Sequence, residues 1–198
     1  MKNTWGKKLL TLFLTVLAVV SFSGTNIANA QTASQTDILT KIKDLEFSFS
    51  SGTGGWSTEV RIFPDGTFSG FHHDNNLGET GPGYPNGTRY ECDFSGKFDK
   101  PVKISNYEYR MKCKSLTQKG KKGGKKIVNG VQVIVSGPYG FDDADEFIIY
   151  LPGKKVAELP EQFRDWVRYS INGADKLTFY GLYNVKGEMG FSSYPRKK

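Results

Sequence analysis

Apolar and polar residues alternate along most of the chain after residue 45, a period of two that is typical of half-buried β-strands. The segment WSTEVRI at residues 56–62 shows this alternation clearly. The Pro-Asp-Gly sequence that follows shortly after favours a tight turn, because proline presets φ and glycine accepts a positive φ. A three-residue loop there pairs Ile62 with Phe68 and Thr58 with His72. We therefore predict an antiparallel hairpin from residue 56 to residue 72.

Further strands are predicted where similar patterns recur between turn sequences, in residues 46–50, 88–98, 106–116, 127–136, 146–152, 177–185 and 190–194. One segment, residues 160–169, has the spacing of a helix instead. It begins with a proline, which is favoured at the first helical position, and has an apolar stripe made by Leu159, Phe163, Trp166 and Val167. With 14% aromatic residues, this pattern predicts an all-β antiparallel meander of about eight strands. We expect a barrel or a curled sandwich, with the helix near residues 160–169 covering it.

The first 30 residues have the composition of a secretory signal peptide. Three lysines precede an apolar run, and the sequence Ala28-Asn29-Ala30 is typical of a cleavage site. The apolar run is shorter than the roughly 18 residues of a membrane-spanning helix. We therefore expect secretion, and no transmembrane span once the leader is removed.

Two parts follow the leader. Residues 31–45 form a polar segment in which the spacing of Ile38, Leu39 and Ile42 is compatible with a short helix. Residues 46–198 are long enough for a single β-rich domain with its own core. The chain after the leader holds 24 basic and 20 acidic residues, a formal charge of +4. This mild excess gives no reason to expect a specific nucleic acid partner.

The two cysteines, Cys92 and Cys113, predict a disulfide, because export would place them in an oxidising compartment. If residues 90–98 pair with residues 107–115 so that Cys92 lies opposite Cys113, the apolar residues of both strands share one face. A bond there closes a loop of about 20 residues and stabilises the fold by roughly 3 kcal/mol. The alternative is a pair of buried free thiols. The spacing matches no metal site, and we expect neither a metal nor a cofactor.

Positive charge is concentrated in one part of the chain. Residues 109–141 carry eight basic residues and no acid. The sequence KGKKGGKK within this block is too rich in glycine to fold alone, so we predict a flexible loop between two strands. Such a loop attracts an anionic polymer, for example teichoic acid, anionic lipid head groups, nucleic acid or a heparin-like glycan. The alternative is a solvated loop that balances the acids of residues 142–146. The predicted contacts are Lys119, Lys121, Lys122, Lys125 and Lys126.

Aromatic residues near glycine-rich turns predict a second kind of site. Trp56 and His72 share the inward face at the open end of the predicted hairpin, while Tyr84 and Tyr139 lie in glycine-rich loops. Rings on adaptable loops suit sugars or apolar ligands, so these four are the predicted ligand-binding residues. The alternative is that they only fill space at turns and strand ends.

Sequence motifs of common hydrolases are absent. Neither G-x-S-x-G nor H-E-x-x-H occurs, and the only two histidines are adjacent, at positions 72 and 73. Paired carboxylates leave no sequence signature, so a carboxylate-based hydrolase of an extracellular polymer stays open, with Asp74, Glu79 and the acids of residues 142–146 as candidates. An enzyme is the less favoured class. A protein-interaction or inhibitor module acting through the loops is a further alternative.

Four short motifs, GGW (54–56), DGTFSG (65–70), CDFSGKF (92–98) and FYGLYN (179–184), resemble a domain of unassigned function in secreted proteins and lipoproteins of Gram-positive bacteria. The resemblance begins near Leu45 and implies neither an activity nor catalytic residues. An early tryptophan on a strand, a meander and a late helix are also similar, as a fold, to the lipocalin and calycin barrels. We therefore expect a secreted binding protein that holds a small ligand or glycan and associates with an anionic envelope polymer through its basic loop.

Overall fold

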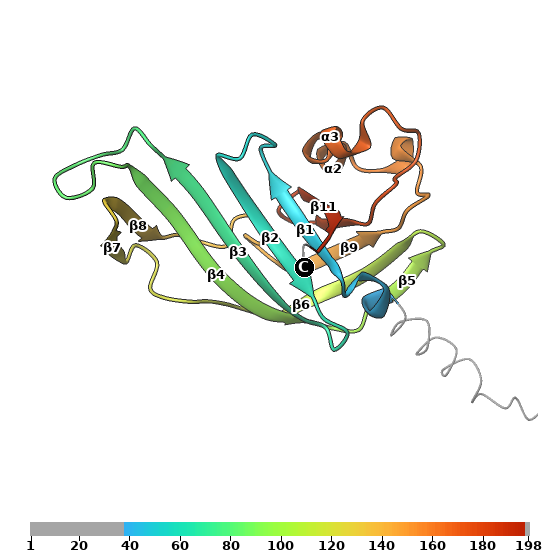
Figure 1. Cartoon of the computed structure of the whole chain (residues 1–198). Helices are drawn as coiled ribbons and strands as arrows, with labels where there is room; N and C mark the ends of the chain where they lie inside the picture. The colour runs from blue at the N-terminus through green and yellow to red at the C-terminus, as the bar shows by residue number, and fades with distance from the viewer. Residues whose placement is uncertain (1–37, 197–198) are drawn as a thin grey trace, which may run out of the picture.

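The computed structural model describes residues 38–196, so the predicted signal peptide lies outside the described residues. Eight antiparallel strands form a closed barrel (Figure 1). Around the barrel they are β1 (Leu45–Ser50), β2 (Trp56–Ile62), β3 (Thr67–Asn76), β4 (Thr88–Phe98), β6 (Glu108–Gln118), β9 (Glu146–Tyr150), β10 (Gly181–Asn184) and β11 (Met189–Pro195). Pairing of β11 with β1 closes the ring. The predicted all-β meander is confirmed, and its closed ring makes it a barrel rather than a sandwich.

The hairpin of β2 and β3 has the predicted register. Ile62 pairs with Phe68, and Thr58 pairs with His72. The turn is closed by a hydrogen bond of 2.9 Å from the Gly66 amide to the Phe63 carbonyl, and Gly66 has a φ of +82°. Glycine adopts this conformation without a steric penalty, which is why the Pro-Asp-Gly sequence located the turn correctly.

Three further strands extend the barrel wall. β5 (Val102–Ser105) pairs with β6, while β7 (Lys125–Val128) and β8 (Val131–Val135) form a hairpin. The first half of β4 pairs in parallel with β8, and its second half pairs with β6. The single strand predicted for residues 127–136 is therefore wrong. Asn129 and Gly130 turn the chain with φ values of 52° and 76°, a conformation that an Asn-Gly pair adopts readily.

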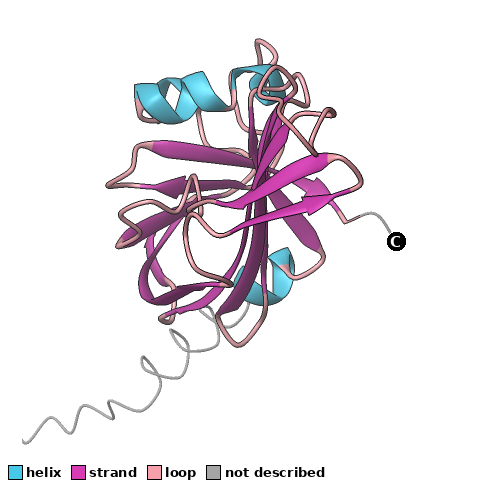
Figure 2. Cartoon of the chain, turned by 90° about the vertical axis from the view of Figure 1, so that its left-hand side faces the viewer, coloured by secondary structure: helices cyan, strands magenta, loops and turns pink. Residues whose placement is uncertain are grey.

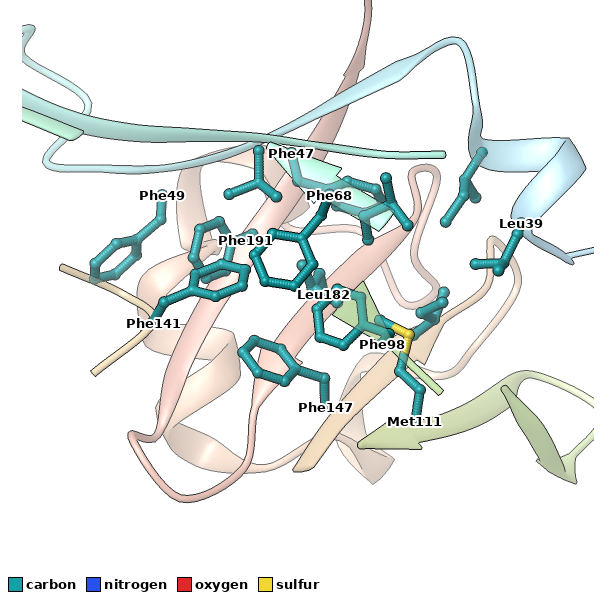
Figure 3. Packing of buried hydrophobic residues seen from close by; sticks show 14 of the residues in the cluster. Leu39, Phe47, Phe49, Phe68, Phe98, Met111, Phe141, Phe147, Leu182 and Phe191 are labelled. Carbon is teal, nitrogen blue, oxygen red and sulfur yellow. The ribbon is translucent and has the colours of Figure 1, made fainter. Parts of the chain in front are cut away.

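The barrel interior is filled by side chains, and phenylalanine is the commonest residue type among them (Figure 3). An eight-stranded barrel is just wide enough for its inward side chains to fill it. One of the central rings, Phe141, comes from the loop between β8 and β9 rather than from a strand. It is fully buried, with ring centroids 5.2 Å from Phe68, 5.1 Å from Phe94 and 4.9 Å from Phe147. The interior is therefore a core, and the loop is part of it.

Short helices cover two parts of the barrel. Residues 38–42 are helical, as predicted, and bury Ile38, Leu39 and Ile42 against the core. Elsewhere η1 (Val156–Glu158), α2 (Glu161–Trp166) and α3 (Arg168–Ile171) lie outside the strands (Figure 2). Phe163 of α2 is buried in a second cluster on the outer face of the wall, which confirms the predicted covering helix. Trp166 departs from the predicted stripe and is 36% exposed.

The predicted disulfide is wrong, because Cys92 and Cys113 are both free. The residue opposite Cys113 on β4 is Phe98, and Cys92 lies opposite His72 on β3. Cys92 and Phe98 are six positions apart on β4, which corresponds to roughly 20 Å, far beyond the reach of a disulfide. The error arose because β5 forms its own hairpin with β6, which shifts the pairing of β6 with β4.

Replacement of Phe141 by alanine is expected to destabilise the fold by about 3–5 kcal/mol, since it leaves a cavity in the middle of the barrel. Urea unfolding followed by tryptophan fluorescence measures the change. The matched control is Phe63→Ala at the 39%-exposed Phe63, for which we expect a loss of no more than about 1 kcal/mol. Equal losses in the two variants would contradict a role for Phe141 as a central core residue.

Both thiols are expected to stay reduced in the folded protein. Burial raises the pKa of the Cys92 thiol to about 11, so little reactive thiolate is present at neutral pH. A thiol reagent should therefore modify Cys92 slowly in the folded protein and rapidly after unfolding in urea. An intact mass lighter by two hydrogen atoms, restored by a reductant, would instead show a disulfide.

Candidate functional site

The loop of residues 136–145 closes one end of the barrel, and we call it the plug loop. Its backbone is held by buried polar side chains of the wall. The amide nitrogen of Asn184 donates to the carbonyls of Gly140 at 3.1 Å and Asp142 at 2.9 Å. The hydroxyl of Thr58 donates to the carbonyl of Tyr139 at 2.7 Å. Because a buried carbonyl without a partner costs about 1–3 kcal/mol, these bonds keep the plug loop in place.

His72 is part of the same network. Its Nδ1 lies 3.0 Å from the Ser57 carbonyl and 2.9 Å from the Thr58 hydroxyl oxygen. A carbonyl only accepts hydrogen bonds, so Nδ1 carries the proton and donates it. Burial lowers the pKa of His72, and the ring is therefore neutral at pH 7. In this position His72 supports the plug loop rather than offering a free base to a ligand.

Of the four predicted ligand-binding residues, three lie close together in the structure. Trp56 and Tyr139 both contact Phe49, with ring centroids 5.0 and 5.2 Å apart, and Tyr139 also contacts His72 at 5.6 Å. Trp166, which sequence reasoning assigned to the helix stripe, joins them at 4.6 Å from Phe49. These rings pack on one another at the plugged end, which we call the aromatic mouth.

Tyr84 makes its contacts in another part of the molecule. It pairs with Gly81 within the loop between β3 and β4. A Cβ on Gly81 would lie 2.6 Å from the Tyr84 ring, so the ring packs directly against the backbone of its own loop. Three of the four predicted residues, Trp56, His72 and Tyr139, are therefore brought together. Tyr84 instead packs within the turn of its own loop.

Three of the acidic candidates are held separately by different partners. Glu79 accepts a hydrogen bond of 2.9 Å from the Tyr90 hydroxyl, Asp143 pairs with Lys186, and Glu146 pairs with Arg110. In residues 38–196 no group of three or more histidines, cysteines and acids is arranged to hold a metal ion. Glu79, Asp143 and Glu146 therefore each serve a separate contact.

A serine, a histidine and a glutamate do meet on the outer face of the wall, which sequence reasoning missed. Ser57 Oγ lies 3.2 Å from His73 Nδ1 and 2.7 Å from Glu59 Oε1. In a hydrolytic triad the carboxylate orients the histidine, and the histidine accepts the serine proton. Here the serine proton points to Glu59, so His73 donates to the serine oxygen and is not placed as a base. The cluster is a cross-strand hydrogen-bond network.

The predicted basic residues Lys119, Lys121, Lys122, Lys125 and Lys126 form what we call the lysine segment. Its backbone follows a defined path, although its composition predicted a flexible loop. The amide of Lys119 donates to the Asp93 carbonyl at 2.8 Å, and that of Gly123 donates to the Val135 carbonyl at 2.8 Å. All five lysine side chains are exposed. Within residues 38–196, none of the recorded ion pairs involves any of them.

Two hollows lie beside the lysine segment on the outer face of β4, β8 and β7. One of about 340 Å³ is lined by Asp93, Lys119 and Val135, among others, and one of about 390 Å³ by Leu77 and Val128. Glu91, Lys126 and Val133 line both. Val131, Val133 and Val135 alternate along β8, so the floor of this face is apolar while its borders are charged.

Sequence reasoning missed Thr58 and Asn184, the residues that hold the plug loop. Both are fully buried polar residues in strands that otherwise point apolar side chains inward. A polar residue at an inward position of a strand is the signal that predicts such a hydrogen bond, but not its partner.

Comparisons with protein-family models, with curated proteins and with solved structures found no match for this chain. The resemblances to a Gram-positive secreted domain and to lipocalins therefore stay predictions. Within residues 38–196, no helix combines the length and the apolar character needed to cross a membrane. The plug loop, the aromatic mouth and the lysine segment are the features of the molecule that bear on its function.

The neutral state of His72 predicts a pH dependence of stability. Below its ordinary pKa of 6.5, the unfolded chain takes up a proton at this position that the folded protein resists. The free energy of unfolding should therefore fall as the pH drops below 6.5, and stop falling once the lowered pKa of the folded state is passed. His72→Asn keeps a donor near Nδ1 and should lose this component, as measured by urea unfolding on both sides of pH 6.5. The control is His73→Asn on the solvent side of β3, and loss of the dependence in that variant instead would contradict the assignment.

Proposed function

We propose that the protein is a secreted, non-catalytic binding module that holds a phosphate-rich polyanion of the cell envelope on its lysine segment. The observation that carries this proposal is the set of five exposed lysines on a backbone tied to β4 and β8, with no acid among their recorded partners in residues 38–196. Unpaired lysines on an ordered backbone attract a polyanion without first breaking internal ion pairs.

The filled barrel supports an external site. Phe141 occupies the space in which a barrel of this kind would hold a small ligand. The rings of the aromatic mouth contact one another, and the polar groups near them hold the plug loop. A small ligand or glycan in the mouth is therefore less well supported than a polymer on the outer surface.

The hydrolase alternative has less support. The candidate acids Glu79, Asp143 and Glu146 each have their own partner, and the Ser57 cluster lacks a base. Surface binding through charge needs no such constellation. It needs a set of like charges that outnumber their counter-charges locally, and the lysine segment provides that set.

The test is binding of a soluble polyphosphate by calorimetry or fluorescence anisotropy across a salt series. Counterion release predicts that the affinity falls with salt, with a log–log slope of magnitude about 3–4 if all five lysines contact phosphate. The quadruple variant Lys121→Gln, Lys122→Gln, Lys125→Gln, Lys126→Gln should lose most of the affinity and most of the slope.

The matched control replaces four exposed lysines elsewhere, at positions 97, 100, 103 and 114, by glutamine. It removes the same charge and should retain most of the affinity, whereas a purely nonspecific attraction would weaken both variants equally. Far-UV circular dichroism checks that each variant is folded. Absence of wild-type binding at low salt, or equal loss in the control, would overturn the proposed function.

A further inference from the structure

Exposed aliphatic side chains gather beside the lysine segment. Leu77 is 76% exposed, Ile127 is 54% exposed and Val128 is 44% exposed. Leu77 belongs to the loop between β3 and β4, and the other two belong to β7. Single exposed aliphatics are common on protein surfaces, but a group of them on one projection marks a contact surface.

The two segments that carry these residues form one projection, which we call the tip. They reach out together at the end of the molecule opposite β5 (Figure 1). The backbone amide of Asn86 donates to the Gly130 carbonyl at 2.9 Å, and its side-chain amide donates to the Asn129 carbonyl at 3.0 Å. Leu77 and Val128 line the same hollow of about 390 Å³. The aliphatic residues are therefore held close together by hydrogen bonds between the loops.

Cations directly adjoin this aliphatic group. Lys125 and Lys126 precede Ile127 in the same four-residue strand, all of whose residues are exposed. β5 has a related composition, since exposed Val102 and Ile104 flank Lys103 there. The tip differs in the number of cations beside its aliphatic residues, because Lys125 and Lys126 continue into the rest of the lysine segment, and in Leu77, which a second loop adds.

We propose that the tip docks on the surface of an anionic lipid bilayer, with Leu77, Ile127 and Val128 entering the interface while the lysines contact lipid phosphates. This inference rests on the proposed function and identifies the polyanion as the head groups of a lipid bilayer. A soluble polymer would engage the lysines and leave the aliphatic side chains in water. A bilayer can contact both groups of side chains, because its anionic head groups attract the lysines and its acyl boundary accepts the aliphatic residues.

The experiment compares two ligands for the secreted protein collected after leader cleavage. One is vesicles of phosphatidylcholine with phosphatidylglycerol, with pure phosphatidylcholine vesicles for comparison, and the other is soluble polyphosphate. We expect co-sedimentation with the anionic vesicles and little with the neutral ones. The variant Leu77→Ser with Ile127→Ser should bind the anionic vesicles at least about tenfold more weakly, because the apolar contact is lost. Its affinity for polyphosphate should equal that of the wild type.

The control Val102→Ser with Ile104→Ser removes two exposed aliphatics from β5 at the other end and should leave both affinities unchanged. Binding of the wild type to polyphosphate but not to anionic vesicles would overturn this inference and leave the proposed function standing. The inference also fails if the tip variant binds vesicles as well as the wild type does, since docking would then depend on charge alone. Binding to neither ligand at low salt would overturn the proposed function as well.

Discussion

The structure depends on the packing of Phe141 inside the barrel. Its ring reaches the centre from a loop and contacts phenylalanines of β3, β4, β9 and β11. That contact pulls the plug loop over one end, and buried hydrogen bonds from Thr58 and Asn184 follow from it, because the loop carbonyls can no longer reach water. A barrel sealed in this way offers its outer surface, rather than its interior, to partners.

Charged and aliphatic residues are distributed unevenly over the outer surface, and this distribution follows from the topology. The second half of β4 pairs with β6 in the closed ring, and its first half pairs with β8. The pairing with β8 carries β7 away from the ring, where its lysines and aliphatic residues are exposed. Ion pairs such as Arg61 with Glu46 neutralise charge elsewhere on the wall. The lysine segment has no ion pair of this kind among the described residues, and this difference is the reason for proposing it as the contact surface.

Local chemistry made part of this fold predictable. The Pro-Asp-Gly turn set the register of β2 and β3, and with it the shared inward face of Trp56 and His72. The register of β4 and β6 was not predictable in the same way, because a short strand, β5, competes for β6 and shifts the pairing of Cys113 to Phe98. The tip could not be predicted from the sequence for a similar reason. Leu77 and Ile127 are far apart in the sequence, and no local pattern indicates that their loops pair.

The continuity of β4 has a consequence for orientation. A hairpin on a glycine-rich tether would leave the barrel free to turn, whereas the β7–β8 hairpin is joined to the wall by the hydrogen-bond ladder of β4. The hairpin is therefore a rigid arm with a fixed angle to the barrel axis. Any surface that seats this arm also fixes the direction of the plugged end, so that the exposed edge of Trp166 and the neighbouring Tyr169 would face the same way in every bound molecule.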